Sequence, residues 1–510
     1  MAIVCYDIYV MFMIVKIDKL SHDFRGISRI NDKVLFIPSV LPEEVVDVRI
    51  TIDKKNYSIG KAMNIITESS NRRKSICPYF DTCGGCSTGY IKYDKALVYK
   101  KESAIDIMKR YAGYDVNPDI ISNYKEYGYR NKIGLKVFNG KVSLTEEESN
   151  NLVNIDKCYL VNDNINKVID SLNKLDLTGI NDVVIKGTNE IMVILNGDTD
   201  RDMIINSLKG MVKSIVLNDE VIYGNDYITI NVDKYKYAVY PKSFFQVNTD
   251  MISKLYDKVK EAAGKGESLL DLYCGAGTIG IYLADNFNRV RGIEINSDAV
   301  EGANLNKKIN DIGNISFECK RASDINSINE EVVVVDPPRG GLDKTTTELL
   351  CNSNVKRIVY VSCNPITLAR DINVLKSKYE LKDITLFDMF PNTKHVETVV
   401  LLSHKKPDGH INVKVEFGEG EGKVPLDNIA KRAESYKPKE RVTYKMIKEY
   451  IEAKYGFKVH TAYIAEVKRD LGLPMYDAPN AVEELKQPRK HPTAEKVEAI
   501  KDALKHFEVI

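Results

Sequence analysis

The sequence has no excess of either charge. It contains 73 Lys and Arg residues against 72 Asp and Glu residues, so its formal net charge is +1. A nucleic-acid partner would have to be attracted by local basic patches, because the field of the whole molecule supplies no attraction. We also expect no targeting segment at the start of this sequence: Met1 to Val15 is apolar, but it carries Asp7, has no basic leading segment and is too short to cross a bilayer. We expect a cytoplasmic protein without a membrane partner.

Neither a disulfide framework nor a disordered chain is indicated. Nine cysteines, an odd number, in a chain without a signal peptide favour thiol or metal chemistry in a reducing compartment. Hydrophobic residues make up 44% and charged residues 28%, which is an ordinary globular composition. Because single cores stop growing well below 510 residues, the chain should divide into three or four domains. We expect a monomer.

Residues 13 to 67 have the pattern of short strands. Five strands with Asn31-Asp32 as a turn suggest a small barrel, and barrels of the OB type bind oligonucleotides. Scattered positive charge comes from Arg25, Arg29, Lys33, Lys54, Lys55 and Lys61. A purely structural barrel fits this stretch equally well.

The middle of the chain contains two further kinds of pattern. A glycine-containing loop at 71–89 is followed by an expected helix at 93–111. Residues 123 to 240 then mix strands and helices and indicate an α+β unit. From about Phe244 to His404 helices and strands alternate, which is typical of an α/β, doubly wound parallel sheet. We expect the chemistry of the protein to lie in this last region.

A separate helical region follows. Gly418 to Gly422 has the composition of a linker, and helices are expected at 444–455, 462–471 and 494–506. The first two, joined through Gly456, could form a helix-turn-helix-like pair. Because acidic and basic residues are nearly balanced there, we favour a small solvated bundle or partner-binding module over groove recognition.

A glycine turn lies between a strand and a helix in the α/β region. The strand at 268–271 leads into Gly275-Ala276-Gly277, and an apolar helix begins at Ile279. Glycines allow a ligand to approach the backbone, and the helix N-terminus favours a negatively charged group. Glu294 follows Gly275 by 19 residues, the separation expected for a carboxylate that binds ribose hydroxyls. A complete G-x-G-x-x-G pattern is present, so a nicotinamide-dependent dehydrogenase remains an alternative at this point.

Two later strands also end in chemically capable residues. Strand 332–335 runs into Asp336-Pro337-Pro338-Arg339, and strand 357–361 runs into Ser362-Cys363-Asn364-Pro365. Ligands of open α/β sheets bind beyond the carboxyl ends of the strands, so the strand-end residues should converge on one crevice. These residues are Asp271, Glu294, Asp336 and Cys363. An Asp-Pro-Pro strand end beside a glycine turn is typical of methyltransferases that act on nucleobases, which argues against the dehydrogenase.

These motifs together resemble the RumA/TrmA family of RNA uracil-C5 methyltransferases. The resemblance covers about Met13 to His404 and rests on Ser243 to Asn248, Asp271 to Gly277, Asp336 to Arg339, Ser362 to Pro365 and His395-Val396-Glu397. With Cys77, Cys83, Cys86 and Cys158, the sequence most resembles the branch of this family that acts on 23S ribosomal RNA. The family implies an OB-like TRAM barrel at 13–70, a cysteine loop at 71–92, an α+β central domain at 93–243 and a class I, Rossmann-like methyltransferase domain at 244–406. The linker and appended helical C-terminal domain at 407–510 lie beyond the part of the chain that the resemblance covers.

The resemblance also implies roles for single residues. Cys363 corresponds to the nucleophile that adds to C6 of uracil, which activates C5 toward the methyl group of S-adenosylmethionine. Glu397 corresponds to the general base that removes the C5 proton. The cofactor is expected to contact Gln246, Tyr273, Glu294 and Asp336. The expected substrate is a uridine in RNA, with ribosomal RNA favoured; transfer RNA is an alternative, and a non-catalytic RNA-binding module is a weaker one.

Four cysteines have ligand spacing. Cys77, Cys83 and Cys86 are close in sequence, and Cys158 is distant. Four thiolates suit either tetrahedral zinc or a [4Fe-4S] cluster, and the spacing alone does not choose between them. The family resemblance implies the iron-sulfur cluster, with a structural or RNA-positioning role.

Overall fold

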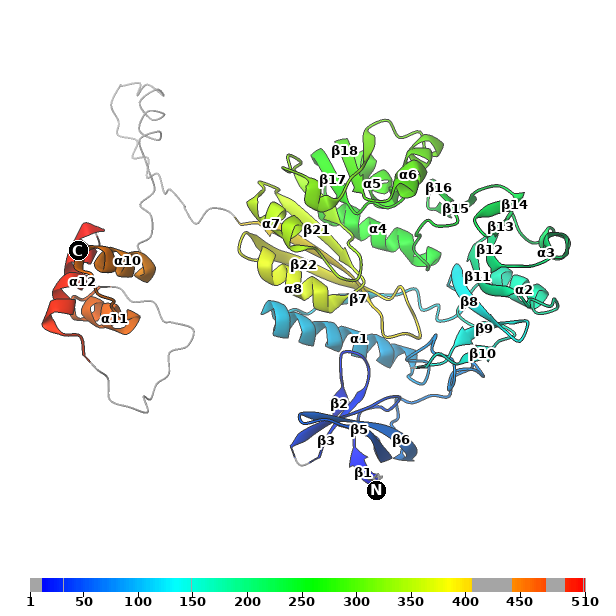
Figure 1. The fold of residues 1–510 in the computed structure, drawn as a ribbon, viewed down its shortest axis with the longest axis horizontal. Coiled ribbons are helices and arrows are strands. Elements are labelled where there is room, and N and C mark those ends of the chain that lie inside the picture. The colour runs from blue at the N-terminus through cyan, green and yellow to red at the C-terminus, as the bar shows by residue number, and fades with distance from the viewer. Residues whose placement is uncertain are drawn as a thin grey trace, which may run out of the picture. The chain divides into compact units, whose positions relative to one another are not determined.

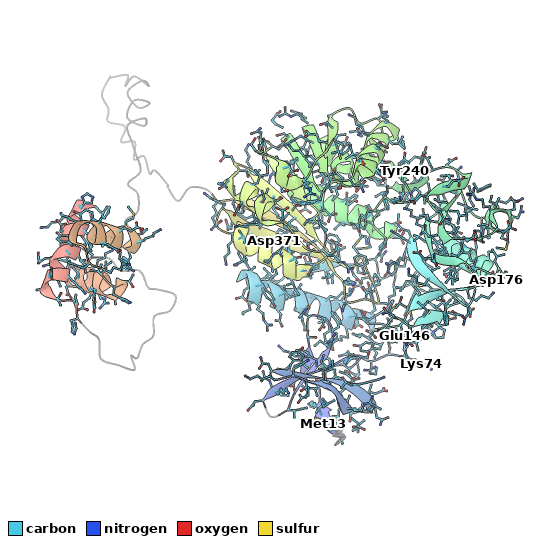
Figure 2. The ribbon with its side chains drawn as sticks, viewed as in Figure 1. Met13, Lys74, Glu146, Asp176, Tyr240 and Asp371 are labelled. Atoms are coloured by element: carbon cyan, nitrogen blue, oxygen red, sulfur yellow. The ribbon has the colours of Figure 1, made fainter. Side chains whose placement is uncertain are left out.

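The computed structural model describes residues 12–405, except 31 and 148, and residues 443–473, 491–507 and 509. The chain forms two compact units, Met1–Gly409 and His410–Ile510 (Figure 1). The linker predicted at Gly418 to Gly422 lies outside the described residues. Within the part of the chain that is described, no helix is both long and apolar enough to cross a membrane. Figure 2 marks Met13 in the N-terminal domain, Asp176 in the central domain and Asp371 in the domain of the largest sheet.

The N-terminal domain is a six-stranded sheet in the order β1-β5-β6-β4-β3-β2. Its strands are β1 (Phe12–Lys16), β2 (Lys19–Leu20), β3 (Gly26–Ile30), β4 (Lys33–Ile37), β5 (Val45–Asp53) and β6 (Tyr57–Thr67). Alternation sets the buried face: Val46 and Val48 of β5 are buried while Asp47 and Arg49 between and beside them are partly exposed. The two edge strands, β1 and β2, do not pair with each other among the described residues. The N-terminal domain is therefore an open sheet and not the closed barrel that the sequence predicts.

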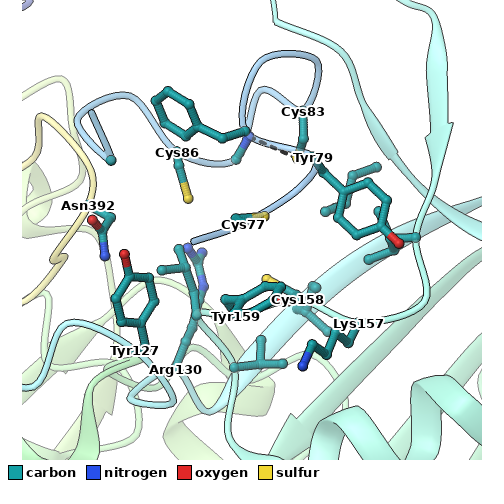
Figure 3. A pocket seen from close by; sticks show the side chains of 18 of the residues that line it. Cys77, Tyr79, Cys83, Cys86, Tyr127, Arg130, Lys157, Cys158, Tyr159 and Asn392 are labelled. Atoms are coloured by element: carbon teal, nitrogen blue, oxygen red, sulfur yellow. Dashed lines mark hydrogen bonds between the residues drawn. The ribbon is translucent and has the colours of Figure 1, made fainter. Parts of the chain in front are cut away.

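The cysteine segment, residues 71–92, follows the N-terminal sheet and carries three of the predicted cysteine ligands. It runs to helix α1 (Tyr93–Ile107), which continues through a π-helical turn to Ala112 and ends at Gly113, where φ is +75°. Cys77, Cys83 and Cys86 face Cys158 of the central domain across a cavity (Figure 3). The four cysteines are therefore neighbours in the fold although Cys158 is distant in sequence.

Helix α1 and strand β7 (Asp119–Ile121) pack on the largest sheet, although both lie in the range predicted for the central domain. Strand β7 pairs in parallel with β22 (Tyr379–Phe387). Ile107 and Met108, at the end of α1, are buried in the same apolar cluster as the strands of that sheet. The chain therefore contributes to the largest sheet before it builds the central domain.

The central domain is a seven-stranded sheet covered by two helices. Its strand order is β10-β9-β8-β11-β12-β13-β14, and a separate hairpin, β15-β16, follows. The elements are β8 (Lys132–Phe138), β9 (Lys141–Thr145), β10 (Leu152–Asn154), α2 (Asp163–Leu172), β11 (Ile180–Gly187), β12 (Ile191–Gly197), α3 (Arg201–Leu208), β13 (Ser214–Leu217), β14 (Glu220–Gly224), β15 (Ile228–Val232) and β16 (Tyr235–Val239). The Asn162 side chain caps α2 by accepting the Ile165 N–H at 3.0 Å.

The largest sheet has eight strands in the order β19-β18-β17-β20-β21-β23-β22-β7. Its strands, besides β7 and β22, are β17 (Gly266–Leu272), β18 (Phe287–Glu294), β19 (Ile315–Cys319), β20 (Val332–Val335), β21 (Arg357–Ser362) and β23 (Glu397–His404). The helices are α4 (Thr249–Ala263), α5 (Thr278–Leu283), α6 (Ser297–Ile309), α7 (Lys344–Asn352) and α8 (Pro365–Leu375). Strands β17 to β21 are parallel, and β23 runs antiparallel between β21 and β22. The predicted doubly wound α/β domain is confirmed.

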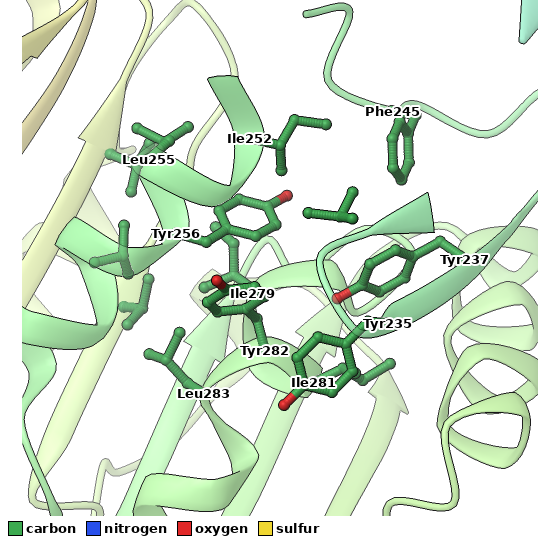
Figure 4. Packing of buried hydrophobic residues seen from close by; sticks show 14 of the residues in the cluster. Tyr235, Tyr237, Phe245, Ile252, Leu255, Tyr256, Ile279, Ile281, Tyr282 and Leu283 are labelled. Carbon is green, nitrogen blue, oxygen red and sulfur yellow. The ribbon is translucent and has the colours of Figure 1, made fainter. Parts of the chain in front are cut away.

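The apolar core between α4, α5 and the sheet supports the start of α5. Figure 4 shows Tyr237, Tyr256 and Tyr282 packed with aliphatic residues of both helices. The Tyr256 and Thr278 hydroxyls lie 2.8 Å apart, and the Tyr237 hydroxyl donates to the Thr278 carbonyl at 3.2 Å. Because Thr278 follows the glycine turn directly, these buried tyrosines fix the helix against which a ligand would bind.

The second unit is a small helical domain with its own core. It contains α10 (Tyr444–Tyr455), α11 (Thr461–Asp470) and α12 (Ala494–His506), close to the predicted bounds. Gly456, with φ of +74°, ends α10, and Ile447, Ile451 and Ile464 are buried together. The predicted helix pair is thus present.

Candidate active site

The residues predicted at the strand ends lie along one edge of the largest sheet. Asp271 and Glu294 are at the carboxyl ends of the neighbouring parallel strands β17 and β18, and Asp336 directly follows β20. Cys363 directly follows β21. Glu397 begins β23, which is antiparallel to β21, so its first residue lies at the same edge. The topology therefore brings the predicted nucleophile, the predicted base and the glycine turn to one edge.

The glycine turn is fixed by hydrogen bonds and leaves space above it. Gly275 and Gly277 have φ of +52° and +75°, a conformation that suits glycine. A Cβ on Gly277 would lie 2.5 Å from the Phe317 ring, whereas no atom lies within 4 Å of a Cβ position on Gly275. The space next to Gly275 is therefore open to a ligand.

The Glu294 carboxylate closes the turn from the neighbouring strand. One oxygen accepts the Gly275 N–H at 3.1 Å, and the other accepts the Asn296 N–H at 2.8 Å. A carboxylate has about four lone-pair positions, so acceptor capacity remains for ribose hydroxyls. Glu294 and the open space at Gly275 fit the adenosine part of S-adenosylmethionine.

The other predicted cofactor residues flank this turn. Tyr273 follows β17 with φ of +63° and is half-buried. Gln246 is buried in the segment between β16 and α4, where its carbonyl accepts the Asn131 side-chain N–H at 2.9 Å. Asp336 lies beside β17, with its N–H directed to the Leu272 carbonyl at 3.4 Å. No hydrogen bond joins Gln246 to the glycine turn in the described structure, so its contact with a cofactor stays a prediction.

Three carboxyl groups at the sheet edge are poorly solvated. Burial raises the pKa of Asp271 to about 8 and that of Asp336 to about 7. Burial, and then the charge of Asp336, raise the pKa of Glu397 well above its ordinary value. Both carboxyl groups of the Asp336 and Glu397 pair therefore bind a proton more tightly than an exposed carboxyl group does.

Cys363 lies in a turn that two asparagine contacts organise. The Asn364 side chain accepts the Ile366 N–H at 3.2 Å, which caps α8, and donates to the Arg339 carbonyl at 3.0 Å. The Asp-Pro-Pro-Arg and Ser-Cys-Asn-Pro segments are thus tied together. Burial, Glu397 and Asp336 raise the pKa of the Cys363 thiol to about 11, and Arg339 opposes them. In the ligand-free protein the thiol is protonated at neutral pH.

Cys363 opens into a cavity of about 200 Å³ that the N-terminal domain helps to form. Its lining includes the cationic side chains of Arg339 and Lys394, and Lys100, whose ammonium group pairs with Asp388. Residues His22 to Phe24 of the N-terminal domain also line it. Burial and the neighbouring cations lower the pKa of His395, another lining residue, to about 4, so it is neutral at pH 7. The contribution of His22 to Phe24 could not be predicted from the sequence, because nothing in a strand pattern shows which distant domain a turn will contact.

The four predicted cysteine ligands line a second cavity, of about 170 Å³, together with Arg130 (Figure 3). Burial and the other three cysteines raise the pKa of Cys86 to about 12, and burial also raises the pKa of Cys77 and Cys83. Four soft thiol donors around one cavity match the donor chemistry of an iron-sulfur cluster. Among the residues described, however, no three His, Cys, Asp or Glu side chains are placed to hold a metal ion. The predicted ligand set is therefore not confirmed and stays a prediction.

Comparison with known proteins gives consistent matches. Residues 202–405 match the model of the tRNA (Uracil-5-)-methyltransferase family, and residues 13–63 match the TRAM domain. An uncharacterized RNA methyltransferase of Halalkalibacterium halodurans is 33% identical over 443 residues, which are 77% of this chain and 96% of the relative. Another from Staphylococcus aureus is 34% identical over 439 residues, covering 76% of this chain and 96% of the relative. Among solved structures, the fold is similar to the crystal structure of Pyrococcus abyssi tRNA (uracil-54, C5)-methyltransferase in complex with S-adenosyl-L-homocysteine, with a TM-score of 0.64. The two sequences are 28% identical, and the match covers 76% of this chain and 100% of that chain.

Proposed function

Because this chain belongs to the family of S-adenosylmethionine-dependent RNA (uracil-5-)-methyltransferases, we propose that it methylates C5 of a uridine through a covalent adduct between Cys363 and C6 of uracil. One observation carries this proposal: the thiol, two poorly solvated carboxyl groups and the open glycine turn lie along a single sheet edge. A non-catalytic RNA-binding module would need the N-terminal domain but not this arrangement.

The chemistry assigns a sequence of tasks to Cys363 and Glu397. C5 of uracil is a poor nucleophile, so the thiolate of Cys363 first adds to C6 and C5 gains enolate character. S-adenosylmethionine supplies the methyl group that C5 attacks. The Glu397 carboxylate then accepts the C5 proton, the electrons of that C–H bond restore the C5–C6 double bond, and the Cys363 sulfur leaves.

The electrostatics of the site favour formation of the thiolate after the cofactor has bound. The charges of Glu397 and Asp336 raise the pKa of Cys363 in the ligand-free protein. A sulfonium cation beside the thiol would add a positive charge that offsets the two carboxylates, and so it would lower the pKa of the thiol. A buried carboxylate with a raised pKa is also a better proton acceptor than an exposed one, which suits Glu397 for the later step.

The cavity at Cys363 is suited to a nucleotide taken out of its stack. A base inside a helix cannot reach the sheet edge, so the uridine has to be flipped or come from a loop. Arg339 and Lys394 supply positive charge for the phosphates on either side of it. Because His22 to Phe24 line the same cavity, the N-terminal domain would also contact this nucleotide.

Two classes of RNA are candidates for the substrate. The cysteine arrangement resembles the branch that acts on ribosomal RNA, which we favour. Transfer RNA is the second candidate, because the Pyrococcus abyssi structure is that of a tRNA (uracil-54, C5)-methyltransferase. Nucleoside mapping of both RNA classes from cells that lack the gene separates them, since 5-methyluridine disappears from only one.

We also propose that Cys77, Cys83, Cys86 and Cys158 hold a [4Fe-4S] cluster. The support is that all four side chains line one cavity and that all are free thiols. Anaerobic purification followed by iron and sulfide determination tests this. Four iron atoms per chain are expected, with loss of the cluster in Cys86→Ser; one zinc atom per chain would contradict it.

The enzymatic proposal is tested with purified protein, S-adenosylmethionine and RNA. Cys363→Ala is expected to bind RNA as the wild type does and to form no 5-methyluridine. Methylation by this variant would exclude the proposed adduct, and RNA binding without any methylation in the wild type would favour the binding module.

A further inference from the structure

The loop that joins β22 to β23, residues 388–396, leads directly into Glu397 and is held by contacts from distant parts of the chain. Its carbonyl groups accept hydrogen bonds in succession. The Asn248 side chain donates to Met389 at 3.2 Å, Lys100 to Phe390 at 3.1 Å, the Tyr129 hydroxyl to Pro391 at 3.0 Å, and the N–H groups of Ser87 and Thr88 to Asn392 at 3.0 and 3.1 Å. The path of this loop is therefore set by α1, the central domain, the start of α4 and the cysteine segment.

Asn392 is the most highly connected residue of the loop. It is buried and has φ of +62°. Its side-chain N–H donates to the Glu126 carbonyl at 2.9 Å, and its side-chain oxygen accepts from Arg73 at 2.9 Å. Arg73 also pairs with the Glu126 carboxylate. A buried asparagine amide with both of its ends bonded fixes the backbone around it more strongly than packing alone.

The same residue links the loop to the cysteine segment. Asn392 and Cys86 line the same cavity (Figure 3). Ser87, the next residue after Cys86, donates its N–H to the Asn392 carbonyl, and its hydroxyl accepts the Lys394 N–H at 2.8 Å. Ser87, which directly follows the predicted ligand Cys86, therefore holds two backbone groups of the loop: the Asn392 carbonyl and the Lys394 N–H.

We propose that Asn392 is a positioning residue for the general base, and that it holds Glu397 in place through the loop 388–396 and the cysteine segment. This inference rests on the proposed role of Glu397. Glu397 is the first ladder residue of β23, opposite Phe387, so the hydrogen bonds of the loop decide how its chain enters the strand. Cys363 is held differently, by β21 and by the contacts of Asn364 with Arg339 and the start of α8. Loss of Asn392 should therefore disturb proton removal more than adduct formation.

The test compares two rates in the full-length protein. RNA that contains 5-fluorouridine reports adduct formation and methyl transfer alone, because fluorine at C5 cannot be removed as a proton. Release of tritium from RNA labelled at C5 of uridine reports proton removal. The variant is Asn392→Gly, which keeps the left-handed backbone but lacks the amide. The matched control is Asn173→Gly, because both ends of the Asn173 amide are also hydrogen-bonded, but within the central domain: it donates to the Ile155 carbonyl at 2.8 Å and accepts the Val142 N–H at 3.1 Å.

In Asn392→Gly we expect tritium release to fall by about 10- to 100-fold, the size of effect that follows misplacement of a catalytic group by roughly 1 Å. Trapping by 5-fluorouridine RNA should stay within about threefold of the wild type, and methylated covalent complex should accumulate with ordinary RNA. Asn173→Gly should alter neither rate.

Two results would overturn the inference: an equal fall in both rates of Asn392→Gly, or no change in either. Glu397→Gln identifies which proposal has failed. If Glu397→Gln accumulates the covalent complex and Asn392→Gly does not, only the positioning role is wrong. If Glu397→Gln releases tritium at the wild-type rate, the base assignment is wrong, and the positioning role is wrong with it.

Discussion

The Glu294 carboxylate accepts the backbone N–H of Gly275 at 3.1 Å. This bond joins the end of β18 to the turn that follows β17, across the boundary between two neighbouring strands. It holds the turn in the conformation that leaves the space next to Gly275 open, and it orients the carboxylate that we expect to bind ribose. The two groups that the sequence pairs by their spacing are therefore in direct contact.

The two glycines of this turn should respond differently to substitution by alanine. A Cβ on Gly277 would meet the Phe317 ring at 2.5 Å, so Gly277→Ala should lower the melting temperature. A Cβ on Gly275 meets no protein atom within 4 Å, so Gly275→Ala should cost only about 1 kcal/mol of backbone strain. It should weaken binding of S-adenosylmethionine instead, because the methyl group occupies the proposed ligand space. Differential scanning fluorimetry and calorimetric titration measure the two effects, and unchanged cofactor affinity in Gly275→Ala would place the cofactor elsewhere.

The convergence of Asp271, Glu294, Asp336 and Cys363 could be predicted because it depends on a local pattern. Each residue lies at the carboxyl end of a strand or directly after it, and parallel strands joined by helices bring their carboxyl ends to one edge. The predicted bounds of α10 and α12 are accurate for a similar reason, since their apolar spacing and capping residues are local signals.

Contacts between distant segments could not be predicted in this way. A helix pattern in the sequence does not show which sheet covers the helix, so the range predicted for the central domain includes α1 and β7, whereas both pack on the largest sheet. The pair of Lys100 and Asp388 joins residues 288 positions apart. The hydrogen bonds of Asn392 likewise combine three segments that have no common motif.

Negative and positive charges near Cys363 should have opposite effects on how fast its thiol is alkylated. Burial, Glu397 and Asp336 raise the pKa of the thiol to about 11, and Arg339 lowers it. The double variant Asp336→Asn with Glu397→Gln should therefore alkylate faster than the wild type at pH 9, and Arg339→Gln should alkylate more slowly. The rate is measured for the Cys363 peptide by mass spectrometry after iodoacetamide treatment, with exposed Cys319 as the internal control. Equal rates in all three proteins would show that these charges do not control the thiol.

Asp271 should make the stability of the ligand-free protein depend on pH. Burial raises its pKa from 3.8 to about 8, so the folded state binds the proton more tightly than the unfolded state. Its contribution is fully present below about pH 4 and is lost as the pH rises toward 8, by up to about 1.4 kcal/mol per pH unit. Asp271→Asn should therefore gain stability relative to the wild type between pH 5 and pH 8. Melting temperatures at both values check this, with Asp311→Asn at an exposed position as the control; a constant difference between variant and wild type would contradict it.

Breaking the buried ion pair at the start of the loop 388–396 should lower the stability of the fold. Lys100 lies 2.6 Å from Asp388, both side chains are almost fully buried, and the Tyr93 hydroxyl donates to the same carboxylate at 2.6 Å. Lys100→Met should lower the free energy of unfolding by about 3–5 kcal/mol, because it leaves a buried carboxylate without its cation.

Urea unfolding measures the effect of Lys100→Met, and the double variant with Asp388→Asn serves as the control. The double variant should recover part of the stability, since the amide that replaces the carboxylate is neutral and can still accept the hydrogen bond from Tyr93. A double variant less stable than Lys100→Met would show that the lost cation is not the cause.

The covalent intermediate offers the most direct measurement of the central claim. Wild-type protein is incubated with S-adenosylmethionine and RNA containing 5-fluorouridine, digested, and the crosslinked peptide is identified by mass spectrometry. We expect a single crosslink on the Cys363 peptide, with one methyl group added to the attached nucleotide. A crosslink on another cysteine, or ordinary methylation of uridine by Cys363→Ala, would contradict the proposed mechanism.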